Sequence, residues 1–316
     1  SGSRLMPLGA VKVGLFAAAG AGGAATGAGY FGGGDWTPLT RVDKFAFPSD
    51  SRTTLATGLS AGTYELAGMA DSGTAGYFGG GSTNAADVDT VDKFAFPSDS
   101  RTTLGTGLSS ARDYPAGMAN SGTAGYFGGG HTGTQVDTVD KFAFPSDSGS
   151  TLGTGLSTGT WRHSAMANSG TAGYFGGGIS LGANINKFAF PSDSRTTLAT
   201  GLSSNRSYLA GMADSGTAGY FCGGRTSAQV DTVDKFAFPS DSRTTLGTGL
   251  SVASGYGAAM ADSGTAGYVG GGYNVSFTEL DLVDKFAFPS DSRTTLGTGL
   301  STTNYNLAAM ADAGSL

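Results

Sequence analysis

Short apolar runs recur along the chain in a fixed order, separated by glycine-rich and polar turns. Between Tyr64 and Ser109 four such runs lie at residues 64–71, 75–81, 91–96 and 101–108. Ser-Gly-Thr joins the first two runs. Pro-Ser-Asp-Ser joins the last two and is a turn sequence, because proline presets φ and the Ser and Asp side chains bond nearby backbone groups. No run keeps a helical period, so the pattern predicts four short β-strands.

The same order of runs occurs six times. The sequence Lys-Phe-Ala-Phe-Pro begins at Lys44, Lys93, Lys141, Lys187, Lys235 and Lys285, at spacings of 46 to 50 residues. A period in this range is typical of repeat folds, and four strands per period indicate a propeller blade. An open solenoid is the alternative, but no repeat carries the polar outer face of a cap. We therefore expect an all-β fold, a six-bladed β-propeller with four-stranded blades.

The two ends of the chain predict how the ring closes. The first repeat lacks its first strand, since residues 18–23 are only alanine and glycine, and residues 305–313 match the missing strand. We expect residues 305–313 to pair beside residues 28–34, with a strand at Val11–Phe16 as the alternative. The predicted domains are a Gly/Ala-rich N-terminal extension, 1–27, and a single propeller, 28–316.

Alternation within the third run predicts how blades pack. Phe94 and Phe96 lie on one face of a strand and Ala95 on the other. A blade buries both faces, so the bulky face of one can fill space left by the small face of the next. We expect these phenylalanines to pack between blades.

The repeat resembles that of the kelch propellers. The resemblance rests on Tyr77-Phe78-Gly79-Gly80, Phe96-Pro97, Leu104 (where that family usually has tryptophan), and an arginine before the first strand, for which Arg112, Arg162 and Arg206 are candidates. It covers nearly the whole chain from Gly29 and implies the same propeller architecture.

A second resemblance lies in the turn before the last strand. Residues 147–152, Asp-Ser-Gly-Ser-Thr-Leu, are similar to the Asp box of sialidases, although the other copies have arginine in place of the glycine. In that family the box is a folding element away from the active site. We expect the aspartate oxygens to accept backbone N–H groups and fix the hairpin.

Composition narrows the classes of function. The net charge is −6 and no basic stripe exists, which argues against nucleic-acid binding. No apolar run approaches the roughly 20 residues of a membrane-spanning helix, so we expect no membrane span. The single cysteine, Cys222, replaces the first glycine of a Gly-Gly-Gly block and is interpreted as a small strand residue. Neither charge nor cysteine content fixes the compartment.

Variation among the six copies falls on one rim of the predicted ring. Successive connections alternate between rims, so the Ser-Gly-Thr and Pro-Ser-Asp-Ser turns share one, the invariant rim. The variable rim holds the connections after Gly-Gly-Gly (35–41, 82–90, 131–138, 179–184, 225–232 and 273–282) and those between blades (61–64, 110–114, 158–163, 204–208, 252–256 and 302–305). Loops on a rigid scaffold are the usual place for binding, so we expect ligands here.

The candidate binding residues all lie on the variable rim. Each connection between blades carries an aromatic residue near its end: Tyr64, Tyr114, Trp161, Tyr208, Tyr256 and Tyr305. These six either bind sugars, peptides or a partner surface, or simply start the inner strand and pack against their neighbours. His131 and His163, with Trp161 and Arg162, either hold an anionic or sugar ligand or are unrelated loop residues.

We expect no metal, cofactor or catalytic site. Two histidines without a paired carboxylate make an incomplete metal site. The aspartates near the third strand (Asp87, Asp89, Asp92, Asp137, Asp140, Asp231 and Asp234) lack the spacing of a calcium loop and are interpreted as surface residues. The glycine blocks precede no helix or lysine and so are not phosphate loops.

These observations predict a non-catalytic β-propeller scaffold or recognition module that binds a partner protein or glycan through the variable rim. Near-identical repeats are similar to propeller modules on virions or cell surfaces, such as phage appendage proteins, which favours an extracellular or virion-surface location by analogy. The alternatives are a structural subunit of a homo- or hetero-assembly and a carbohydrate-active enzyme, sialidase-like or galactose-oxidase-like.

Overall fold

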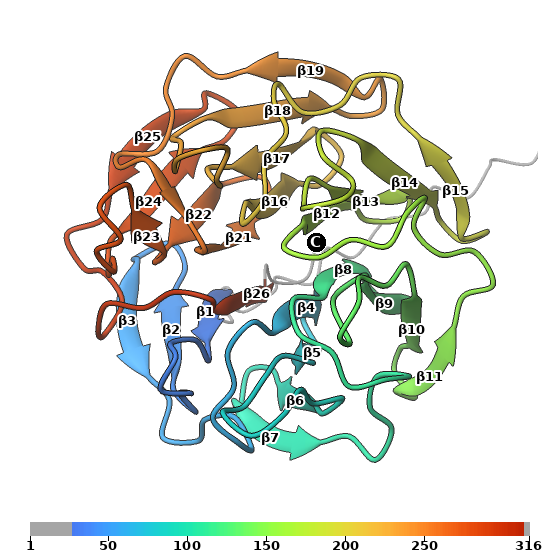
Figure 1. Cartoon of the computed structure of the whole chain (residues 1–316). Coiled ribbons are helices and arrows are strands. Elements are labelled where there is room, and N and C mark those ends of the chain that lie inside the picture. Colours follow the sequence, from blue (N-terminus) through green and yellow to red (C-terminus); the bar gives the residue numbers. More distant parts are fainter. Residues whose placement is uncertain (1–26, 313–316) are drawn as a thin grey trace, which may run out of the picture.

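The structure, a computed structural model, describes residues 27–312, and these form six four-stranded antiparallel sheets arranged in a ring (Figure 1). From the channel outwards, blade 1 is β26 (Ala308–Asp312), β1 (Ala28–Gly32), β2 (Val42–Ala46) and β3 (Ser51–Thr54). Blade 2 is β4 (Ala67–Asp71), β5 (Ala75–Gly79), β6 (Val91–Ala95) and β7 (Ser100–Thr103). Blade 3 is β8 (Ala116–Asn120), β9 (Ala124–Gly128), β10 (Val139–Ala143) and β11 (Ser148–Thr151).

The other three blades repeat this order. Blade 4 is β12 (Ser164–Asn168), β13 (Ala172–Gly176), β14 (Ile185–Ala189) and β15 (Ser194–Thr197). Blade 5 is β16 (Ala210–Asp214), β17 (Ala218–Cys222), β18 (Val233–Ala237) and β19 (Ser242–Thr245). Blade 6 is β21 (Ala258–Asp262), β22 (Ala266–Gly270), β24 (Val283–Ala287) and β25 (Ser292–Thr295). Two short strands, β20 (Ser254–Gly255) and β23 (Tyr273–Asn274), pair on the variable rim.

The ring closes as the sequence predicts. β26 pairs antiparallel with β1, with Met310 opposite Tyr30, so the last described strand completes the first blade (Figure 1). The alternative strand at Val11–Phe16 lies outside the described residues. The strands are shorter than the apolar runs: β7 ends at Thr103, and Leu108 is a buried loop residue.

Neighbouring blades interlock through side chains that fill glycine positions. The sulfur of Met69 in blade 2 lies where a Cβ on Gly125 of blade 3 would have to stand. A Cβ on Gly79 of blade 2 would lie 2.7 Å from the ring of Phe127 in blade 3. The first kind of contact recurs at all six interfaces and the second at five, so glycine is required there by close approach rather than by backbone conformation.

The sixth interface shows a matched exchange. Cys222 of blade 5 stands where the other blades have glycine, and Val269 of blade 6 stands where they have phenylalanine. Both side chains are buried in one apolar cluster. The larger residue on one blade is thus accommodated by a smaller one on the next. Burial raises the pKa of the Cys222 thiol to about 12, which fits a packing residue.

The aspartate of each Pro-Ser-Asp-Ser turn joins two blades. The Tyr30 hydroxyl donates to Oδ1 of Asp99 at 2.8 Å, and Lys44 Nζ donates to Oδ2 at 2.7 Å. Tyr30 also stacks on Phe96, with ring centroids 5.3 Å apart, which confirms that these phenylalanines pack between blades. The arrangement recurs at Asp50, Asp147, Asp193, Asp241 and Asp291.

Two expectations about aspartates are corrected. The turn aspartates accept the tyrosine and lysine of the preceding blade, where we expected backbone N–H groups of their own hairpin. Asp92, Asp140 and Asp234 are buried rather than on the surface. Asp92, for example, accepts the Thr103 hydroxyl of its own blade at 2.6 Å and the Ser60 backbone N–H of the preceding connection at 2.7 Å. Burial is tolerated because hydrogen bonds satisfy the carboxylate.

The exchange at residues 222 and 269 predicts strong coupling between them. Val269→Phe alone should destabilise the protein by about 1–3 kcal/mol through overpacking, and Cys222→Gly alone by a similar amount through the space left behind. The double variant recreates the interface of the other blades and should unfold within about 1 kcal/mol of the wild type. Urea unfolding of the four proteins measures this cycle, and additive losses would contradict it.

Candidate functional site

The mouth of the central channel on the variable rim is formed by one residue from each blade. In all six copies this residue directly precedes the short segment that leads into the innermost strand, and its φ lies between 48° and 68°. The six side chains border a hollow of about 110 Å³. We call them the mouth residues: Glu65, Tyr114, Arg162, Tyr208, Tyr256 and Asn306.

A belt of backbone hydrogen bonds fixes the mouth. The Tyr114 N–H donates to the carbonyl of Glu65 at 2.8 Å, and the Tyr208 N–H donates to that of Arg162 at 2.7 Å. The Tyr256, Asn306 and Glu65 N–H groups donate in the same way to the mouth residue of the preceding blade. A left-handed backbone costs a non-glycine residue about 1–2 kcal/mol. Glycine would avoid that cost, so the side chains at these positions serve some purpose other than the backbone geometry.

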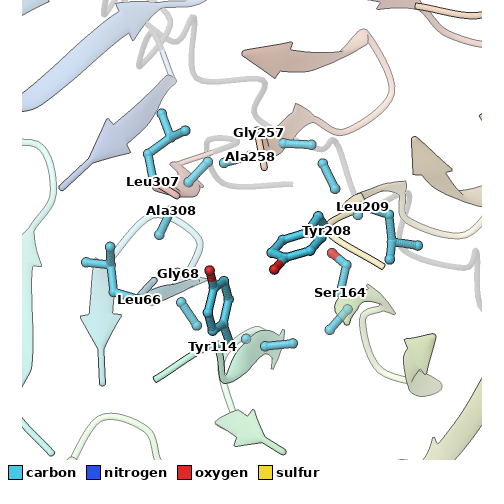
Figure 2. Close-up of a pocket in the computed structure, with 18 of the residues that line it drawn as sticks. Leu66, Gly68, Tyr114, Ser164, Tyr208, Leu209, Gly257, Ala258, Leu307 and Ala308 are labelled. Carbon is cyan, nitrogen blue, oxygen red and sulfur yellow. The ribbon is translucent and has the colours of Figure 1, made fainter. Parts of the chain in front are cut away.

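Aromatic rings surround a guanidinium group in the mouth. The Arg162 guanidinium carbon lies 3.5 Å from the ring centre of Trp161, 4.6 Å from that of Tyr208 and 5.1 Å from that of Tyr114. Tyr208 stacks on Tyr256, with ring centres 3.6 Å apart. The hydroxyls of Tyr114 and Tyr208 point into the hollow (Figure 2). The mouth therefore presents a cation and phenolic hydroxyls against flat apolar faces.

Two carboxyl groups have raised pKa values: Glu65 in the mouth, and Asp113, which directly precedes the mouth residue Tyr114. Burial raises the pKa of Glu65 to about 8, although a hydrogen bond from the Tyr114 hydroxyl opposes the shift. Burial and the nearby charge of Asp87 raise the pKa of Asp113 to about 6. Asn306 Nδ2 donates to Glu65 Oε1 at 3.2 Å. Near neutral pH, Glu65 is mainly a neutral acid.

Outside the mouth, aromatic rings continue across the rim in a chain of contacts. Trp36 lies 5.1 Å from Tyr64 and 6.5 Å from Tyr305, measured between ring centres. Tyr305 lies 4.1 Å from Tyr273, which in turn lies 6.2 Å from Phe277. We call this row the aromatic ridge: Tyr64, Trp36, Tyr305, Tyr273 and Phe277. It crosses connections of blades 1, 2 and 6.

The structure separates the aromatic residues expected to form one ring. Tyr114, Tyr208 and Tyr256 are mouth residues, together with Arg162. Tyr64, Trp161 and Tyr305 stand one position earlier and lie further from the channel. Tyr64 and Tyr305 belong to the aromatic ridge, and Trp161 stacks on His131 at 4.7 Å.

His163 lines the same hollow from a buried position. It takes the position that is leucine in blades 2, 5 and 1 (Leu66, Leu209 and Leu307), and it packs beneath the mouth against Phe175. Burial lowers its pKa to about 4.

Sequence reasoning missed Glu65, Asn306 and Asp113. The signal was present, since Glu65 and Asn306 directly follow Tyr64 and Tyr305 and have the same distance to the inner strand as Tyr114. Aligning the copies by their strands instead of their aromatic residues would have found the mouth position.

The three arginines grouped by sequence have two different roles. Arg112 and Arg206 are fully buried and form ion pairs of 2.9 Å with Asp140 and 2.6 Å with Asp234, so they hold neighbouring connections together. Arg162 stands two positions later in its repeat and lies in the mouth.

Among residues 27–312 no cluster of three or more His, Cys, Asp or Glu side chains is arranged to hold a metal ion. The same residues contain no helix able to span a membrane.

The raised pKa of Glu65 predicts a pH dependence of stability. Between about pH 4.3, where an exposed glutamate ionises, and pH 8, the unfolded chain loses a proton that the folded chain keeps. Glu65 therefore makes stability fall as pH rises through this range. In Glu65→Gln the decrease in the free energy of unfolding between pH 6 and 8 should be smaller than in the wild type. The decrease below pH 6 that is due to Asp113 should remain.

Urea unfolding at pH 5, 6, 7 and 8 measures this, with Asp89→Asn, a change at an exposed carboxylate, as the control. An undiminished decline between pH 6 and 8 in Glu65→Gln would mean that Glu65 is not protonated in the folded protein.

No protein-family model matches the chain, and no curated protein matches its sequence. The chain is a six-bladed β-propeller by its own strand order and pairing.

Proposed function

We propose that this propeller is a non-catalytic recognition module that binds a glycan through its variable rim. One observation carries the proposal. The large apolar side chains that are exposed among residues 27–312 all lie on connections of this rim: Trp36 (57%), Ile179 (48%), Val275 (55%) and Phe277 (54%). Ring contacts through Tyr305 and Tyr273 join Trp36 to Phe277, and exposed apolar side chains that form one patch mark a binding site.

The chemistry of the rim suits sugars. The exposed rings of the aromatic ridge, Trp36 and Phe277, can stack on the apolar faces of sugar rings. Beside them, the mouth supplies phenolic hydroxyls, an amide, a carboxyl and a guanidinium group that can bond sugar hydroxyls. The hollow of about 110 Å³ has room for several water molecules or one ring-sized group. A glycan that crosses the ridge could thus place one residue in the mouth.

The arrangement of the candidate catalytic groups supports binding over turnover. Glycoside hydrolases of the common two-carboxylate type hold the groups about 5–9.5 Å apart, so that a sugar bond fits between them. Glu65 and Asp113 are instead close neighbours, and each shifts the pKa of the other. A galactose-oxidase-like site needs a cysteine linked to a tyrosine, and Cys222 is buried against Val269 in a blade interface.

A partner protein is the second candidate, and Ile179 and Val275 favour it. These aliphatic side chains are exposed and cannot stack on a sugar ring as an aromatic residue does. A kelch-like module on a virion or cell surface is the setting we propose for either ligand. The buried Arg112 and Arg206, which precede inner strands, support the kelch likeness.

A glycan array tests the proposal. Trp36→Ala and Tyr114→Ala should each weaken binding of the glycans retained by the wild type by about tenfold or more, since each removes an aromatic contact worth about 1–2 kcal/mol. Thr123→Ala, at an exposed position of the invariant rim, is the matched control and should bind as the wild type does. Retention of no glycan by the wild type would remove the glycan proposal and leave the partner protein.

A further inference from the structure

We infer that the channel mouth is a subsite for one carboxylate group of an acidic sugar, with Arg162 as the residue that binds it. The inference deepens the proposed function and rests on it, because it names the chemical class of the glycan residue that enters the mouth.

Three aromatic rings at the mouth already surround a cation. Three aromatic rings within 5.1 Å of a positive group are what a protein uses to bind an ammonium ligand. Here the chain supplies the positive group itself, since the Arg162 guanidinium stands among Trp161, Tyr208 and Tyr114. A cationic ligand would be repelled by it. The guanidinium itself has no ion-pair partner among the described residues, so the ligand that would complement it is an anion.

The hydrogen-bond donors of Arg162 are unused. Its Nε is buried without a hydrogen-bond partner, and in the part of the chain that the structure describes Arg162 forms no ion pair. Trp161 Nε1, beside it, is also buried without a partner. Arg112 and Arg206 differ, because each has an aspartate within 2.9 Å. An arginine presents its donors in a planar fork that matches a carboxylate, and a buried unmet donor costs free energy until an acceptor arrives.

Other charged groups lie near Arg162. The positive charge of Arg162 lowers the pKa of Glu65 and of Asp113, and the negative charge of Asp87 raises both. His131 Nδ1 lies 3.7 Å from Asp113 Oδ1. Tyr114 and Tyr208 remain neutral, since burial raises the pKa of both hydroxyls. With Glu65 protonated, the negative charges that remain near Arg162 are those of Asp113 and Asp87. They repel a ligand with one negative charge less than a ligand with two, which favours a carboxylate over a phosphate.

This arrangement also sets the pH dependence of binding. Protonation of Glu65 near pH 8 and of Asp113 near pH 6 removes negative charge beside the ligand. The carboxylate of a sugar acid stays ionised above about pH 4. Affinity for an acidic sugar should therefore rise as the pH falls from 9 to 5, and Glu65→Gln should flatten the upper part of that curve.

The probes are methyl β-D-glucuronoside and methyl β-D-glucoside, which share a ring and differ in carboxylate against hydroxymethyl. The chain has two tryptophans, so in a Trp36→Phe background the fluorescence of Trp161 reports on the mouth alone. We expect the glucuronoside to bind with a Kd at least tenfold smaller than the glucoside. Arg162→Gln should abolish this preference, and Arg162→Lys should keep part of it because the charge remains.

The matched control is Arg225→Gln. Arg225 is a cation of the same rim that lies over Phe277, outside the mouth, and its loss should leave the preference intact. Thermal unfolding of each variant separates loss of binding from loss of folding. Displacement of the glucuronoside by an equal concentration of inorganic phosphate would overturn the assignment to a carboxylate.

The outcomes separate this inference from the proposed function. Equal binding of the two glycosides, binding of neither, or an unchanged preference in Arg162→Gln would each overturn the carboxylate subsite. The proposed function would survive any of these if the glycan array still shows binding that Trp36→Ala removes. Failure of the array as well would remove both.

Discussion

The contact between neighbouring blades is the constraint on which the rest of the structure depends. Neighbouring blades interlock in both directions: methionines such as Met69 fill glycine positions on the next blade, and phenylalanines such as Phe127 fill glycine positions on the preceding one. Because the ring is closed, every blade has two such interfaces, and a change on one blade must be matched on its neighbour. Cys222 and Val269 are such a matched pair. This mutual dependence explains why the Gly-Tyr-Phe-Gly and Lys-Phe-Ala-Phe-Pro-Ser-Asp segments are nearly identical in all copies.

The same constraint frees the variable rim to differ. Packing and the aspartate contacts between blades use the strands and the invariant rim, so they do not depend on the exposed side chains of the other rim. The backbone belt around the mouth then holds six positions in one geometry whatever their side chains are. Glutamate, arginine, asparagine and tyrosine all occur there. A fixed frame with exchangeable side chains is how a rigid scaffold presents a binding surface.

Much of the fold could be predicted from the sequence because the same order of strand-forming segments occurs six times. The number of blades, the closing strand and the invariant rim all follow from the spacing of identical segments. The role of Asp99 could not be predicted, since its partners Tyr30 and Lys44 lie in the preceding blade, 69 and 55 residues away. The mouth was only partly predicted. Tyr64 and Tyr114 are both aromatic residues near the end of a connection between blades. Tyr64 is three positions before its inner strand and Tyr114 is two, and this difference of one residue places them at different points on the rim. The burial of His163 could not be predicted, because nothing in the loop sequence shows that it occupies a position that is leucine in other blades.

The central claim is that contacts between blades hold the ring and that the mouth side chains serve binding. The most direct test is the triple variant Tyr114→Gly, Tyr208→Gly and Tyr256→Gly, measured by urea unfolding and on the glycan array. Glycine relieves a left-handed backbone worth about 1–2 kcal/mol at each position, which offsets the lost ring contacts of about 0.5–1.5 kcal/mol each. The account predicts unfolding within about 2 kcal/mol of the wild type together with loss of glycan binding. A ring that no longer folds, or one that folds and binds as before, would contradict it.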